Sequence, residues 1–189
     1  REARGEDGRP GIVCNGKWIG RTVGRLTQLS CTVDPTVGFE SYMEVKPVSK
    51  PTNVVVIGGG PGGLEAARCA AERGCSVTLY EQADHLGGTL LTIATGDFKW
   101  RIPQLIKWYE VQLKKLGVKV VLNTEIGVDD PVLESADAVF VATGSKPILP
   151  AIPGIEQATD VAQIHKNGMP EGKNVGIGGG RHPAQDTAI

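Results

Sequence analysis

The most constraining feature of the sequence is one continuous stretch, Asn53–Glu81, in which strand-like, glycine-rich and helix-like segments follow one another. Its first part, 54–57, is β-branched and apolar, which predicts a buried strand. A glycine-rich turn follows, and an Ala-rich segment over 64–73 then predicts a helix that Gly74 ends. A second predicted strand over 76–80 ends on Glu81. This order is typical of a dinucleotide-binding βαβ unit.

The glycines of this turn stand at the spacing GxGxxG. Gly58 permits a tight turn, Gly60 lacks a Cβ and lets the backbone approach a pyrophosphate, and Gly63 allows close helix–strand packing. The helix N-terminus would offer unpaired N–H groups and a positive dipole end to the phosphates. Glu81 stands at about the 20-residue offset of an acid that binds ribose hydroxyls. The predicted site comprises Gly58, Gly60, Pro61, Gly62, Gly63, Glu81 and Gln82.

Two further glycine-containing turns accompany this fingerprint. Gly87 and Gly88, followed by Thr89, would let the loop after Glu81 pass close to a bound nucleotide, although a simple turn is the alternative. A predicted buried strand over 137–142 leads into a second turn, at Ala142, Thr143 and Gly144. We expect both turns to contribute to the same site.

Composition excludes several classes of protein. The 189 residues carry a net charge of −1 and give no electrostatic case for nucleic acid or an anionic membrane. No run approaches the ~18 apolar residues of a membrane span, and no signal peptide is visible. Four scattered cysteines do not suggest a disulfide framework, so we expect a reducing, cytoplasmic setting. The chain begins with Arg and ends inside an expected strand-turn-helix unit, so we expect a piece of a longer or split polypeptide.

The remaining segments predict three regions. Residues 1–51 form an irregular arm and linker, 52–150 a Rossmann-like domain, and 151–189 a connector with the start of a second nucleotide-binding domain. In the middle region we expect an amphipathic helix over 100–116, a strand over 118–122 and a turn at 129–131. Trp100 and Trp108 fall off the apolar stripe of that helix, so they either meet another domain or lie exposed. Residues 174–177 predict a second-domain strand.

The motifs together resemble the two-dinucleotide flavoprotein reductases of the glutathione-reductase structural type. The resemblance rests on VVVIGGGPGGLEAA, TLYEQADHLGG and DAVFVATGSKPILPAIPGI, and covers residues 52–180. It implies an α/β fold with a three-layer FAD-binding domain, and FAD, or its ADP half, at the first fingerprint. In this family, sequence after an inserted NAD domain completes the FAD domain. The chain would then need a further segment or chain to complete its flavin site.

The arm is similar to a narrower group, the old-yellow-enzyme-like NADH:flavin oxidoreductases that include trimethylamine dehydrogenase and 2,4-dienoyl-CoA reductase. Its segments RPGIVCNGKWIGR and LSCTVDPTVGFE carry this resemblance. It implies an FMN-barrel partner or domain and a cysteine-rich segment holding a 4Fe–4S cluster. Cys14 and Cys31 match two cluster ligands, whereas Gly11 and Trp18 stand at or near the other two. Because neither supplies a thiolate, we expect the cluster to be lost, unless a partner chain completes it.

The second glycine turn also departs from the family pattern. Gly178 and Gly180 match, but Pro183 takes the third glycine's place and Arg181-His182 precede it. NAD(P) binding there is therefore an open question. Two functions remain: an FAD-binding electron-transfer module of a flavin-dependent oxidoreductase, or an assembly subunit holding ADP or FAD without redox activity. A plain NAD-dependent dehydrogenase explains neither the LGG loop nor the ATG turn, and no residue is a convincing acid, base or nucleophile.

Overall fold

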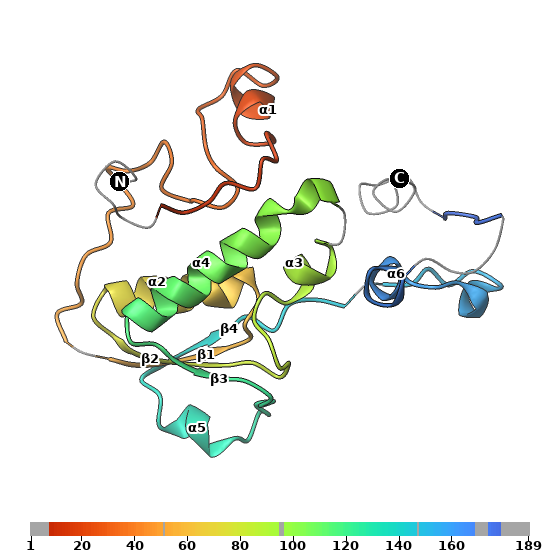
Figure 1. Cartoon of the computed structure of the whole chain (residues 1–189). Coiled ribbons are helices and arrows are strands. Elements are labelled where there is room, and N and C mark those ends of the chain that lie inside the picture. The colour runs from red at the N-terminus through yellow and green to blue at the C-terminus, as the bar shows by residue number, and fades with distance from the viewer. Residues whose placement is uncertain (1–7, 51, 95–96, 147, 169–173, 179–189) are drawn as a thin grey trace.

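The computed structural model describes residues 8–50, 52–94, 97–146, 148–168 and 174–178. Their helices and strands follow one another in a β-α-β order after an irregular arm (Figure 1). In chain order they are α1 (Ile19–Thr22), β1 (Asn53–Ile57), α2 (Pro61–Glu72), β2 (Ser76–Tyr80), α3 (Thr89–Thr92), a 3-10 turn (Asp97–Lys99), α4 (Arg101–Lys115), β3 (Lys119–Val121), α5 (Pro131–Glu134), β4 (Ala138–Val141), a second 3-10 turn (Ile155–Gln157) and α6 (Val161–Asn167).

The four strands form one parallel sheet in the order β3-β2-β1-β4. Helices α2 and α4 lie on one face of it, and α5 lies on the other side (Figure 1). In register, Val54 pairs with Val77 and Val56 with Leu79. Parallel strands joined by crossover helices give the α/β, Rossmann-like class that the sequence predicted.

The core lies between the sheet and the two long helices. Leu64 and Ala67 of α2 and Leu79 of β2 are completely buried there. Helix α4 contributes its predicted apolar stripe, of which the buried members are Ile102, Leu105, Ile106, Tyr109 and Leu113. Alternate residues of a strand share a face, and positions three or four apart share a helix stripe, so both periodic patterns meet in one core.

Strand β4 corrects one prediction. Its sequence is apolar and predicted a buried strand, but Phe140 is 47% and Val141 73% exposed. β4 pairs with β1 and forms an edge of the sheet; its Ala138 packs against the core, but Val139, Phe140 and Val141 are left exposed within the described part of the chain. Apolar composition predicted the strand correctly and its burial wrongly, because burial depends on a covering element.

A second correction concerns residues 174–178. We predicted a strand there, but these residues have no strand conformation, and Val175 and Ile177 are 46% and 41% exposed. A strand forms only with a partner for its backbone N–H and C=O groups, and the four-stranded sheet does not extend to this segment. Gly180, Arg181, His182 and Pro183 lie outside the described residues.

The expected irregular arm packs against the core and the helices. Ile12 and Val33 contact the buried cluster of the core. Trp108, which falls off the apolar stripe of α4, lies beneath the guanidinium of Arg9 at 4.7 Å from the ring centroid, while Trp100 is 54% exposed. Trp108 therefore meets the arm of its own chain. None of the helices in the described part of the chain is long and apolar enough to cross a membrane.

Candidate functional site

The candidate site lies where β1 ends and α2 begins. The N–H of Gly58 donates to the carbonyl of Tyr80, which carries the sheet pairing into the turn. Gly60 is the N-cap of α2 in an extended conformation, and Pro61 occupies the first helical position. The first turn of an α-helix leaves backbone N–H groups without intrahelical partners. A 12-residue helix therefore directs its positive end to this place.

Two glycines of the fingerprint are required by the protein's own packing. A Cβ on Gly58 would lie 2.3 Å from the carbonyl oxygen of Ala142, and the φ angle of Gly58 is +106°. A Cβ on Gly63 would lie 1.8 Å from the carbonyl oxygen of Gly58. Both distances are far below any real contact, so only residues without a Cβ allow α2 and β4 to pack this closely against the end of β1.

Two other glycines of the turn are not explained by packing. A Cβ on Gly60 or Gly62 would meet no protein atom within 4 Å. The bare backbone at these positions thus faces open space at the positive end of α2. Such a cradle accommodates a pyrophosphate, whose oxygens accept from backbone N–H groups and which a Cβ would push away.

Glu81 is placed to support this turn as well as to meet a ligand. Its side chain is buried, with 8% of the residue exposed. Oε2 accepts from the N–H of Gly59 at 2.5 Å, and Oε1 accepts from the N–H of Ala83 at 2.8 Å. The sequence suggested a ribose-binding acid, and the structure adds a role that it did not reveal. The carboxylate fixes the glycine turn and the loop after β2 relative to each other.

The two companion turns converge on the same place. Gly87 donates its N–H to the carbonyl of Gly59 at 2.8 Å, and a Cβ on Gly88 would lie 3.1 Å from the Cα of Gly60. Ala142 donates its N–H to the carbonyl of Ile57 at 2.8 Å, which brings the ATG turn beside Gly58. The structure thus gathers the three predicted turns, although they are far apart in the sequence.

The outer members of the predicted site are exposed. Gln82, Thr89, Thr143 and Gly144 lie at the surface, with Thr89 opening the short helix α3. Gly144 has a φ of +79° and open space around it. These four residues are therefore exposed and are not part of the buried core.

Two further side chains that could take part in acid–base or nucleophilic chemistry are His85 and Cys69, and each has a neighbouring side chain as its partner. His85 lies beside Asp84, with Nδ1 and Oδ1 2.6 Å apart on an exposed loop, and this contact lowers the pKa of Asp84. Cys69 lies on α2, where burial and the neighbouring Glu65 raise the pKa of its thiol to about 11. Both groups are thus engaged by neighbouring side chains, Asp84 and Glu65, rather than by the glycine turn.

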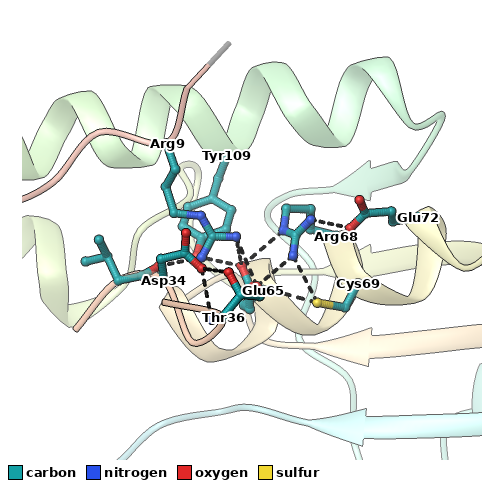
Figure 2. A network of polar contacts seen from close by, with 9 residues as sticks. Arg9, Asp34, Thr36, Glu65, Arg68, Cys69, Glu72 and Tyr109 are labelled. Atoms are coloured by element: carbon teal, nitrogen blue, oxygen red, sulfur yellow. Dashed lines mark hydrogen bonds and ion pairs between the residues drawn. The ribbon is translucent and has the colours of Figure 1, made fainter. Parts of the chain in front are cut away.

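Sequence reasoning missed one cluster of polar side chains on the outer side of α2. Glu65 lies at its centre and accepts from Arg9 of the arm, from Arg68 of the same helix and from Tyr109 of α4 (Figure 2). The only signal in the sequence was the i,i+3 spacing of Glu65 and Arg68. The approach of Arg9 joins residues 56 positions apart and had no local signature.

Fold and site together define a dinucleotide-binding Rossmann module. The comparisons with known proteins agree. The family model described as "Pyridine nucleotide-disulphide oxidoreductase" matches residues 52–181. The chain belongs to this family, which implies binding of FAD and NAD(P). The fold class and the family predicted from the sequence are thereby confirmed.

Relatives and solved structures cover most of the chain. An NADH oxidase of Thermoanaerobacter brockii is 39% identical over 83% of this chain and 24% of its own length. A cinnamate reductase of Clostridium sporogenes is 38% identical over 91% of this chain and 26% of its own. A 2-naphthoyl-CoA reductase in complex with 2-naphthoyl-CoA superposes with a TM-score of 0.71 and 31% identity, over 87% of this chain and 28% of that one. The chain thus spans about a quarter of the length of these proteins.

Proposed function

We propose that the chain binds the ADP half of FAD and serves as the nucleotide-binding module of a flavin-dependent oxidoreductase. The observation that carries the proposal is the contrast within the glycine turn. Gly58 and Gly63 are demanded by packing, whereas Gly60 and Gly62 face open space at the N-terminus of α2. At the N-terminus of a helix, two glycines that the packing does not require fit a ligand that approaches the backbone.

In this proposal the pyrophosphate lies against Gly60 and Gly62, and receives hydrogen bonds from the first turn of α2. The carboxylate of Glu81, already held by Gly59 and Ala83, accepts from the ribose hydroxyls with its remaining lone pairs. Gln82, Gly87, Gly88 and Thr89 border the nucleotide on one side, and Ala142, Thr143 and Gly144 on the other. When bound, the flavin supplies the redox chemistry, and the protein supplies grip and orientation.

The module would work with an old-yellow-enzyme-like FMN barrel, as a partner chain or as a domain of a longer polypeptide, and with a segment completing the FAD domain. Support comes from the resemblance of the arm and from the relatives, which are longer and include an oxidase and reductases. The exposed edge strand β4 is where such a completing segment would add. In the same proposal, the chain divides into an arm before about residue 51, a nucleotide-binding domain up to about residue 150, and the start of a second domain. The protein would be located in the cytoplasm.

For the arm we propose that no 4Fe–4S cluster is bound. Cys14 lies exposed with its Sγ 3.1 Å from the hydroxyl of Thr32, and a Cβ on Gly11 would meet open space. Within the described residues, no three His, Cys, Asp or Glu side chains gather as metal ligands. The proposal rests on Gly11 and Trp18, which supply no thiolate where the family pattern has cluster ligands, and iron and sulfide analysis of the purified protein tests it.

A second candidate is an assembly subunit that holds ADP or FAD without redox activity. The replaced cluster residues favour it, because electrons would lack a carrier in the arm. NAD(P) binding at the second glycine turn stays an open part of the first candidate.

The absorption spectrum of the purified, undenatured chain separates the two candidates. Flavin bands, with FAD released on denaturation and identified by chromatography, support the electron-transfer module. A colourless protein that releases ADP supports the assembly subunit and contradicts the first proposal. Glu81→Ala should weaken binding of either nucleotide, and Glu125→Ala, at an exposed position outside the site, is the matched control.

A further inference from the structure

The arm and the candidate nucleotide helix are joined by one half-buried ionic cluster. Arg9 donates from Nη2 to both carboxylate oxygens of Glu65, at 3.1 and 3.0 Å, and its Nη1 donates to the carbonyl of Val33 (Figure 2). The side chains of Arg9 and Glu65 are only 11% and 21% exposed. Arg9 also stacks over Trp108 and Tyr109, at 4.7 and 5.7 Å from the ring centroids. Through this one side chain the arm contacts both α2 and α4.

Glu65 receives more donors than any single ion pair would supply. Arg68 donates at 2.8 Å to Oε1 and at 3.2 Å to Oε2, and the hydroxyl of Tyr109 donates at 2.8 Å to Oε2. Arg68 also donates to Glu72 at 2.6 Å. Among the side chains that form ion pairs with Glu65 or Arg68, two arginines balance two glutamates, and Arg9 supplies one of the two positive charges. Asp34 of the arm lies in the same polar network (Figure 2).

The position of this cluster matters because α2 begins at the candidate site. Glu65 follows Pro61 by four residues, so it lies about 6 Å along the helix axis from the first helical position. A carboxylate that close to a helix N-terminus opposes binding of an anion there. Arg9 and Arg68 cancel that charge, and Arg68 is itself shared with Glu72. The arm therefore supplies the charge that leaves the end of α2 attractive to a pyrophosphate.

We propose that Arg9 is a positioning residue that couples docking of the arm to nucleotide binding by neutralising Glu65. This inference rests on the proposed function, because it concerns the same nucleotide site. It goes further in one respect: a residue of the arm, which does not touch the nucleotide, sets its affinity. Coupling of this kind is reciprocal, so a bound nucleotide also holds the arm more firmly against α2.

The charge logic gives an expected sign for each variant. Arg9→Met leaves the cluster with one net negative charge and should weaken ADP binding about threefold to tenfold, as expected for a unit charge on the order of 10 Å away. Glu65→Gln leaves one net positive charge and should tighten binding by a similar factor. The double variant is neutral again and should bind ADP within about twofold of the natural chain.

Titration calorimetry of the full chain with ADP, repeated with adenosine, makes the test. Adenosine has no phosphate, so its affinity should change less than twofold in any variant. Raising the salt from about 20 mM to about 500 mM should remove most of the ADP difference, since the Debye length then falls to a few ångströms. Arg9→Lys should restore binding. Arg25→Met, an exposed arginine elsewhere on the arm, is the matched control and should have no effect.

A purely structural role for the cluster predicts the opposite pattern. Both single variants would then weaken ADP and adenosine alike, without dependence on salt, and this result would overturn the coupling. Unchanged ADP affinity in Arg9→Met at low salt would overturn it too. If Arg9→Met does not fold, Glu65→Gln decides alone, since it must tighten ADP binding. Failure of the natural chain to bind ADP at all would instead contradict the proposed function itself.

Discussion

The β1–α2–β2 region and the edge strand β4 differ sharply in burial, although both contain apolar strand residues. In the β1–α2–β2 half, Val56, Leu64 and Leu79 are fully buried. In the half that begins with β4, Phe140, Val141 and Leu149 are 47%, 73% and 57% exposed. Helices α2 and α4 cover the β1–α2–β2 region, whereas β4 packs Ala138 against the core and leaves Val139, Phe140 and Val141 exposed within the described chain. The difference teaches that the β1–α2–β2 region is stabilised by its own buried core, whereas β4 presents exposed apolar side chains at the edge of the sheet.

The largest effect on the free energy of unfolding is expected in the β1–α2–β2 region. Leu79→Ala removes a side chain with no exposed surface and should lower the free energy of unfolding by about 4 kcal/mol. Leu79→Met, which conserves volume, should cost less than about 1.5 kcal/mol. Urea unfolding followed by circular dichroism measures both variants. A loss below 1 kcal/mol in Leu79→Ala would break the comparison between the two halves.

The glycine turn should be almost as sensitive. A Cβ at Gly63 would lie 1.8 Å from a backbone carbonyl that cannot move without disturbing β1. We expect Gly63→Ala to cost about 3 kcal/mol in the same unfolding experiment. Gly62→Ala, one residue earlier and facing open space, should change stability by less than about 1 kcal/mol. Equal midpoints for the two variants would refute the division into packing and ligand glycines.

The ionic cluster around Glu65 of α2 should make the stability of the chain depend on pH. Burial alone would raise the pKa of Glu65, but hydrogen bonds from Arg68 and the charges of Arg9 and Arg68 lower it from 4.5 to about 2. The resulting stabilisation is fully present above pH 4.5 and is lost as the pH falls toward 2. It is on the order of 2 kcal/mol after allowance for partial exposure. The stability difference between the natural chain and Glu65→Gln should therefore shrink as the solution is acidified to pH 2.

The smallest effect on the free energy of unfolding is expected in the edge strand β4. Val141→Ala truncates a side chain that is 73% exposed and should change the free energy of unfolding by less than about 0.5 kcal/mol. Unfolding of this variant beside Leu79→Ala sharpens the comparison most directly, since both residues are apolar and lie in strands of one sheet. A cost above 2 kcal/mol for Val141→Ala would show that the edge is covered in solution.

The sequence predicted much of the fold because its signals are local. The position after the helix stop at Gly74 predicted β2, and the helical spacing of apolar residues predicted α4, both almost to the residue. Gly58 and Gly63 have the packing roles that their spacing suggested. Long-range geometry could not be predicted in this way. The hydrogen bond from Gly59 to Glu81 and the reach of Arg9 to Glu65 depend on how distant segments pack. The exposure of β4 was missed because apolar composition does not show whether a covering element is present.

The most direct test of the central claim is a titration of the full chain with ADP, comparing the natural sequence with Gly60→Val. The matched control is Gly127→Val, because both glycines face open space at negative or extended φ and only Gly60 belongs to the turn. We predict that all three chains unfold at nearly the same temperature, that Gly127→Val binds ADP normally, and that Gly60→Val loses at least about a hundredfold in affinity. Unchanged affinity in Gly60→Val would contradict the assignment of this turn as the nucleotide site.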